Sequence, residues 1–181
     1  VRAGASGSNS GSDWNNAYTA LPASLLRGAT YHIADGNYPA YTFDDAENST
    51  QHITIRKATS SEHGTGVGWN EDYGNGQASF YSNCSSYLGN PTTCITWTFR
   101  TGYWIIDGAT GNWSNSSEYG FSIEPSNGYN QNYVYLERGY RSDLNNISIS
   151  HVSISCSGLS SNTEQLGIGG GTLSYKHDSS F

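Results

Sequence analysis

Carboxylate side chains that could do chemistry lie in two parts of the chain. Asp44, Asp45 and Glu47 form a short acidic run, and carboxylate oxygens are ligands that Ca²⁺ prefers. The alternative for this run is an ordinary solvated bend. Asp107 and Glu124 lie near the ends of apolar runs, and two carboxylates at a suitable separation form the catalytic pair of a hydrolase. Sequence spacing does not set that separation, so both remain catalytic candidates.

The densest cluster of charge comprises Glu137, Arg138, Arg141 and Asp143. Arginine binds planar carboxylates well, so Arg138 is a candidate for holding an acidic ligand, and a local ion pair in a loop is the alternative. His151 lies where an alternating pattern shifts register, and we interpret it as a hydrogen-bonded wall residue. The sequence shows no Ser-His-Asp order, phosphate loop or dinucleotide motif.

Net charge and the distribution of apolar residues narrow the kinds of molecule that we expect the chain to bind. The 181 residues carry a formal net charge of −7, which disfavours binding to nucleic acid. No run of about 18 apolar residues is present, so we expect no membrane span. The chain has no Met, which indicates that residue 1 is a processed or trimmed end. A processed N-terminus without a signal peptide is typical of a secreted protein, and equally of a fragment.

Cysteine and asparagine positions suggest covalent modification. Cys84 and Cys94 bracket a short loop, so we predict a disulfide between them, with two buried thiols as the alternative; Cys156 has no evident partner. Five sequons for N-glycosylation occur, at Asn48, Asn83, Asn112, Asn115 and Asn146. With 17 Asn and 43 Ser or Thr among 181 residues, chance alone gives about 17 × 43/181, or roughly four sequons. Their number is therefore no sign of selection for glycans.

Short alternating segments dominate the rest of the chain. Residues 1–29 predict an initial strand and a short capping helix that begins at Asp13 and ends before Pro22. Residues 30–181 predict many strands of three to five residues, among them 30–34, 41–43, 53–57, 78–81, 95–99, 103–107, 121–123, 133–136 and 166–168. Residues 147–155 predict two short strands, with a shift of register between Ser150 and Val152. The fold class is therefore all-β. The density of strands favours a coil of parallel strands over a sandwich, although Asp-Gly and Asn-Gly pairs keep a sandwich open.

Several of these segments resemble secreted right-handed parallel β-helix proteins of the pectate-lyase-like superfamily. The resemblance is carried by residues 1–7, 12–17 and 27–38, and by the later segments 53–58, 104–108 and 146–149. It implies a right-handed parallel β-helix with a short N-terminal capping helix, a single domain over residues 30–181 and a possible fragment of a longer helix. A group that includes lyases, tailspikes and adhesins does not define one activity.

A lyase of this group implies a basic residue as catalyst, often with Ca²⁺ to neutralise the uronate carboxylate. Candidates for the base are Lys57, Arg100, Arg138 and Lys176, and a solvated strand end is the alternative for the Arg56-Lys57 pair. The loop aromatics Trp69, Trp113 and Tyr119 could stack on sugar rings or simply cover neighbouring strands. We expect no cofactor other than this Ca²⁺.

Three functions follow as expectations. The first is a secreted or cell-surface structural or adhesive protein that self-associates through the ends of its helix and forms fibres, because no C-terminal cap is evident after Lys176. The second is a polysaccharide lyase or another carbohydrate-active enzyme. The third is a glycan-binding module without catalysis.

Overall fold

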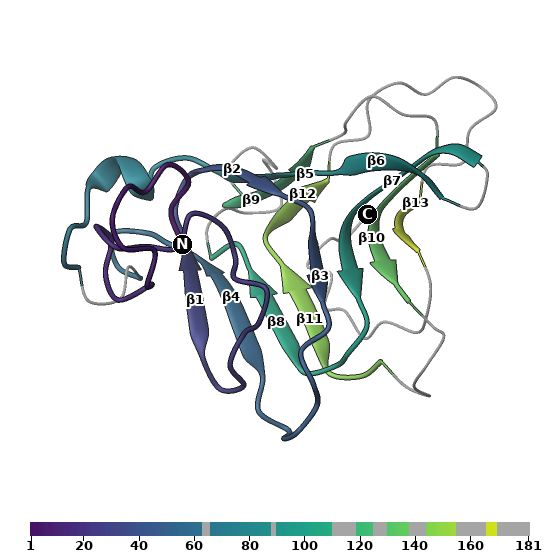
Figure 1. Ribbon diagram of the computed structural model, residues 1–181, viewed down its shortest axis with the longest axis horizontal. Coiled ribbons are helices and arrows are strands. Elements are labelled where there is room, and N and C mark those ends of the chain that lie inside the picture. Colours follow the sequence, from purple (N-terminus) through teal and green to yellow (C-terminus); the bar gives the residue numbers. More distant parts are fainter. Residues whose placement is uncertain are drawn as a thin grey trace.

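The computed structural model describes residues 1–62, 66–87, 90–109, 119–124, 130–137, 144–154 and 166–169 (Figure 1). For residues 83–87, 90–94, 124, 130–133 and 166–169 it describes the backbone alone. The elements in chain order are β1 (Thr30–Ile33), β2 (Gly36–Pro39), β3 (Tyr41–Phe43), β4 (Ile53–Lys57), η1 (Glu71–Tyr73), β5 (Ala78–Tyr81), β6 (Asn83–Tyr87), β7 (Asn90–Phe99), β8 (Trp104–Asp107), β9 (Phe121–Glu124), β10 (Asn130–Leu136), β11 (Ile147–Ser150), β12 (Val152–Ile154) and β13 (Leu166–Gly169).

These strands form three parallel sheets that the chain visits in turn. Sheet A has the order β1-β4-β8-β11, sheet B has β12-β9-β5-β2, and sheet C has β13-β10-β7-β3, with β6 paired to β7. Figure 1 shows the four strands of sheet A side by side in chain order. The prediction of an all-β chain with parallel strands is confirmed. Among the described strands, only β6 and β7 pair antiparallel. The sheets of a sandwich consist of antiparallel strands, so these mainly parallel sheets do not form a sandwich.

Alternation along each strand decides which side chains enter the core. In β4, Ile53, Ile55 and Lys57 are buried while the two residues between them are partly exposed. Parallel pairing in register then stacks buried residues of one sheet, as in the row of Ile53, Trp104 and Ile147. Burying each such aliphatic side chain contributes about 1.5–3 kcal/mol.

Aromatic rings fill the space between sheets B and C. The rings of Phe43 and Phe99 stack with centroids 4.4 Å apart, and Trp97 packs edge-on against Phe80 at 5.1 Å. Trp97 and Phe99 are fully buried. Aromatic packing of this kind gives a low-apolar chain a real core, because each ring buries a large area.

The predicted capping helix is wrong, because residues 1–29 contain no helix or strand. At the expected start of the helix, Asp13 Oδ1 accepts hydrogen bonds from the backbone and the side-chain amide of Asn16, at 2.8 and 3.0 Å. The first of these is the bond of a helix N-cap, but the backbone groups that would continue a helix bond elsewhere. The Asn16 carbonyl oxygen accepts from the Ser10 and Gly11 N–H groups, and the Tyr18 carbonyl oxygen accepts from the Arg2 N–H. At Gly11 an added Cβ would overlap the ring of Tyr18, so the loop requires glycine there.

Other strand predictions can be compared with the structure. Residues 147–155 divide as predicted into two short strands, β11 and β12, separated by His151. Strand β2 was missed, because Asp35, Gly36 and Asn37 are typical turn residues. Gly36 has a φ of 136°, a value that glycine adopts readily. Strand β2 begins at this residue and belongs to a different sheet from β1, so residues 35–37 do not form a hairpin turn.

Candidate functional site

A polar row crosses the outer face of sheet A near the C-terminal ends of its strands. His32, Arg56, Asp107 and Ser150 are partners in register on β1, β4, β8 and β11. Adjacent strands of a sheet lie about 4.8 Å apart, so the register alone brings residues from distant parts of the chain together. His151 follows Ser150 directly and extends the row at the corner between sheets A and B.

The closest pair in this row is Asp107 with His151. Nδ1 of His151 lies 2.8 Å from Oδ1 of Asp107, and the Ser150 hydroxyl donates to the same oxygen at 3.1 Å. The Ala109 backbone N–H also donates to it at 2.9 Å. Burial opposes ionisation of Asp107, but these three hydrogen bonds and the charge of His151 outweigh it and lower the pKa of the carboxyl. Asp107 is therefore a carboxylate at neutral pH.

The backbone at His151 holds its ring at the corner. His151 has φ of 53°, in the left-handed region that few residues other than glycine and asparagine adopt. Its carbonyl oxygen would lie 2.0 Å from a Cβ built on Gly108, so only glycine fits beneath it. The ring of Tyr119 lies edge-on to the His151 ring, with centroids 6.1 Å apart. The imidazole is thus placed by packing as well as by its hydrogen bond.

Arg56 supplies the positive charge of the site. Its Nη2 lies 3.3 Å from Oε1 of Glu62, and its Nε lies 3.8 Å from Oδ2 of Asp107. The Arg56 and Glu62 side chains are 35% and 42% exposed, so their ion pair adds little to stability. The guanidinium instead presents a positive charge to solvent beside the carboxylate–imidazole pair.

This arrangement matches the requirements of general base catalysis. A carboxylate that accepts from Nδ1 fixes the tautomer of the imidazole and leaves Nε2 to take up a proton. The His151 side chain is 41% exposed, and no hydrogen bond from the described residues engages Nε2. An arginine beside such a base can bind an anionic group of a substrate. The three residues together could remove a proton close to a bound carboxylate.

Lys57, a predicted base, points away from this site into the core. Its side chain is fully buried, and Nζ lies 2.6 Å from Oδ1 of Asp35. Nζ also donates to the Ala58 carbonyl oxygen at 2.6 Å and to the Tyr73 carbonyl oxygen at 3.5 Å. Desolvation lowers the pKa of Lys57, and the bond to Asp35 and its charge oppose this effect. The ammonium therefore joins three segments of the chain and does not reach solvent.

In the structure, Asp45 and Glu47 of the acidic run accept hydrogen bonds from backbone N–H groups of other segments. Asp45 Oδ1 accepts from the Leu25 N–H at 2.8 Å, while Glu47 accepts from the Gly102 N–H. Arg27 donates to the Asp45 and Gly102 carbonyl oxygens at 2.6 and 2.9 Å. The carboxylates thus bind different parts of the backbone. Within the described ranges, no group of three or more His, Cys, Asp or Glu side chains is placed to hold a metal ion.

Other predicted residues lie apart from the polar row. Arg100 pairs with Glu137 at 2.5 Å and with Asp44 at 3.9 Å, where β7, β10 and β3 of sheet C end. The Trp69 ring packs edge-on against Trp14, with centroids 5.0 Å apart. Arg138, Arg141, Asp143, Lys176, Trp113 and Cys156, as well as the side chain of Glu124, lie outside the described residues.

The predicted modification sites are partly visible. Backbone pairing of β6 with β7 sets Cys84 directly opposite Cys94. Directly opposed residues of antiparallel strands have Cα separations that a disulfide can span. Asn48 and Asn146 are exposed, whereas Asn112, Asn115 and the side chain of Asn83 lie outside the described part. The disulfide and the glycans remain predictions.

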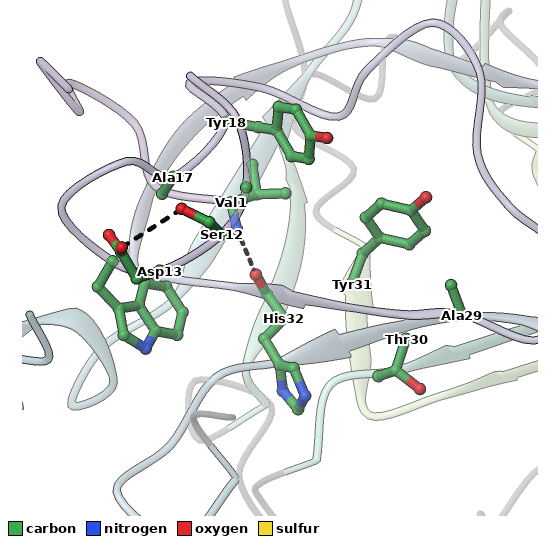
Figure 2. A pocket seen from close by; sticks show the side chains of 11 residues that line it. Val1, Ser12, Asp13, Ala17, Tyr18, Ala29, Thr30, Tyr31 and His32 are labelled. Carbon is green, nitrogen blue, oxygen red and sulfur yellow. Dashed lines mark hydrogen bonds between the residues drawn. The ribbon is translucent and has the colours of Figure 1, made fainter. Parts of the chain in front are cut away.

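A pocket lies at the other end of sheet A, beside the free edge of β1 (Figure 2). It has a volume of about 330 Å³, and Tyr18, Tyr31 and Val1 form much of its wall. The Val1 nitrogen donates to the His32 carbonyl oxygen at 2.6 Å, as the dashed line in Figure 2 shows. Apart from the two tyrosines, its titratable side chains are His32 and Asp13, and the Asp13 carboxylate is engaged by Asn16 and Ser12.

Sequence reasoning missed the combination of Arg56, Asp107 and His151. Asp107 was a candidate, but its expected partner was Glu124, and His151 was interpreted as a wall residue. The available signal was the alternation itself, which places Arg56 and Asp107 on the outer face of their strands. The register that aligns them with Ser150 depends on the lengths of the loops between strands, which no local pattern encodes.

Comparisons of the chain with protein-family models, curated proteins and solved structures found no match. Among the described residues, no helix is long and apolar enough to cross a membrane.

Proposed function

We propose that this chain is a secreted right-handed parallel β-helix that cleaves an acidic polysaccharide by β-elimination. The architecture is supported by three parallel sheets, each built from every third strand apart from β6. Connections between parallel strands of one sheet are right-handed in about 98% of cases, which supports the handedness. The resemblance of residues 1–7, 27–38 and 53–58 to secreted β-helix proteins supports the location and the substrate class.

One observation carries the reaction: the Asp107 carboxylate lies between an exposed imidazole and a guanidinium, with Oδ1 2.8 Å from Nδ1 of His151 and Oδ2 3.8 Å from Nε of Arg56. In the proposed step, Nε2 of His151 takes the proton from the carbon next to the uronate carboxyl group. The electron pair of that C–H bond forms a carbon–carbon double bond, and the adjacent glycosidic C–O bond breaks. The leaving oxygen takes a proton from solvent. No oxidant or further reactant is needed.

Each residue has a distinct part in this step. Asp107 holds the imidazole and stabilises the imidazolium that forms, because the low pKa of its carboxyl keeps it charged. Arg56 binds the uronate carboxylate and stabilises the negative charge that develops on it. Tyr119 lies beside the base, where a sugar ring can contact its aromatic face.

The test is the release of unsaturated uronides from polygalacturonate or alginate, followed by ultraviolet absorbance with and without added Ca²⁺. We expect turnover by the wild type and a loss of about 10²–10⁴-fold in kcat for His151→Asn. Asparagine tolerates the left-handed backbone at this position, so the variant should fold. His52→Asn is the matched control, since His52 lies on the same sheet and contacts Tyr103 instead of the polar row.

The other outcomes separate the alternative functions. A wild type that releases no unsaturated product, or a His151→Asn variant as active as the wild type, overturns the proposal. Binding to a glycan array without turnover would identify a binding module. Assembly into fibres without glycan binding would support the structural or adhesive role.

Glycosylation has its own test. The intact mass of the protein from a glycosylating host shows whether any of the five sequons carries a glycan.

A further inference from the structure

The Arg56 guanidinium lies between two carboxylates and is bonded closely to neither. Its Nη2 lies 3.3 Å from Oε1 of Glu62, whereas a charge-assisted hydrogen bond of arginine is about 2.7–2.9 Å long. Its Nε lies 3.8 Å from Oδ2 of Asp107, which is beyond hydrogen-bonding distance, and no other described acceptor bonds to this nitrogen. An arginine has five N–H donors, so the described residues leave much of its capacity to bind a carboxylate unused.

Of the two carboxylates, Asp107 is held in place by other partners. Its Oδ1 lies 2.8 Å from Nδ1 of His151 and accepts from the Ser150 hydroxyl at 3.1 Å and from the Ala109 N–H at 2.9 Å. A movement of this carboxylate would break all three contacts at once. Asp107 therefore stays in the polar row when a ligand arrives.

Glu62 has no comparable anchor. It lies in the turn that follows β4, where its backbone N–H donates to the Thr59 carbonyl oxygen at 3.0 Å. Its side chain is 42% exposed, and within the described part of the chain the contact with Arg56 is the one ion pair or hydrogen bond of its carboxylate. An exposed pair of this kind is weak, because water competes for both charges and two long side chains lose freedom when they are held together. The Glu62 carboxylate can therefore leave Arg56 at little cost.

We propose that Glu62 occupies the anion position of Arg56 in the free protein and that the uronate carboxylate of the substrate replaces it there. Binding then exchanges one carboxylate for another at the same guanidinium. Glu62 thereby sets the affinity of the site for acidic sugars and takes no part in the proton transfer. The inference rests on the proposed function, because both concern Arg56, but its test measures binding and not cleavage.

The test measures how tightly the acidic trimers trigalacturonate and trimannuronate bind to proteins that carry His151→Asn, which keeps the ligand intact. Isothermal titration compares this variant with one that also carries Glu62→Gln. We expect Glu62→Gln to tighten binding roughly two- to fivefold, the range that the strength of an exposed ion pair sets. Binding of a neutral galactose trimer should not change, because that ligand has no carboxylate to exchange.

Glu137→Gln is the matched control. Glu137 pairs with Arg100 at 2.5 Å, away from the polar row, so this variant removes the same negative charge from a different ion pair. Its effect on binding measures the long-range contribution of net charge. A second control adds Arg56→Gln. In that background Glu62→Gln should no longer change the affinity, because the position that both carboxylates use is absent.

An unchanged affinity in the Glu62→Gln protein would overturn the inference, as would equal tightening by Glu137→Gln or an effect that persists with Arg56→Gln. A lack of measurable binding of both acidic trimers would overturn it as well. Failure of the proposed function is seen separately. A wild type that binds the trimers but releases no unsaturated product would refute the elimination and leave the role of Glu62 standing.

Discussion

At the scale of single residues, the pair of Lys57 and Asp35 carries an electrostatic cost that the structure offsets locally. Lys57 is fully buried, and Asp35 is 17% exposed. Removing a buried ammonium from water costs several kcal/mol, which is recovered only with good partners. Nζ has the carboxylate and the Ala58 carbonyl oxygen, and Asp35 Oδ2 accepts from the Gly76 N–H at 2.5 Å. The pair thereby links the end of β4 to the segments that contain Asp35 and Gly76.

We predict that Lys57→Met lowers the free energy of unfolding by about 3 kcal/mol, because it leaves the Asp35 carboxylate without its cation. The double variant Lys57→Met with Asp35→Asn should recover part of that loss, since no charge is then left unpaired. Urea unfolding of the four proteins of this cycle measures the coupling. A double variant that loses as much as the two single variants together would show that the two side chains are not coupled and that the ion pair has no stabilising role.

At the scale of elements, the hairpin of β6 and β7 departs from the parallel arrangement. Its backbone register pairs Cys84 with Cys94 and shifts between Ser85 and Tyr87. A two-stranded hairpin has marginal stability by itself. A disulfide across it would limit the freedom of the unfolded loop. The hairpin is therefore the element for which the predicted bond matters most.

We predict that Cys84→Ser with Cys94→Ser lowers the free energy of unfolding by about 2–3 kcal/mol under oxidising conditions and changes little in the presence of a reductant. Denaturant unfolding with and without reductant makes the comparison. Cys156→Ser is the matched control, because we expect that thiol to be free. Peptide mapping without reduction should join the segments that contain Cys84 and Cys94. Free thiols at both positions would contradict the prediction.

At the scale of the whole molecule, charge affects how the proposed substrate approaches. The chain has a net charge of −7, and a polyuronate is also an anion. Long-range repulsion slows the encounter of like charges, and salt screens it over a Debye length of about 8 Å at 0.15 M. Arg56 acts only at short range, because Glu62 and Asp107 lie beside it. Binding must therefore depend on contacts within the polar row and not on steering.

We expect kcat/KM on polygalacturonate to rise as NaCl is increased from low concentration to about 0.15 M, since screening removes the repulsion. Sucrose added at the same osmolality, which screens no charge, is the control and should give no such rise. Initial rates of uronide release measure both. A rate that falls with salt would show that a positive surface guides the substrate, contrary to this prediction, while leaving the assignment of His151 to its own test.

Local patterns in the sequence are enough to predict that the chain is built from short strands with one buried face. Alternation placed Ile53 and Ile55 inside, and the same period of two placed Arg56 and Asp107 outside, because successive side chains of a strand point to opposite faces. The interruption of this alternation also predicted the boundary between two strands at His151. Local patterns of this kind need no knowledge of distant residues.

Contacts between distant residues follow from the tertiary structure. Arg56 aligns with Asp107, 51 residues further along the chain, and Asp107 aligns with Ser150, 43 residues further still. The buried faces of the strands and the loops between them set this register. Lys57 turned inward because Asp35, on another segment, was there to bind it. The N-terminal segment is a loop and not a helix, because the backbone groups of Trp14, Asn16 and Tyr18 bond to residues outside the expected helix.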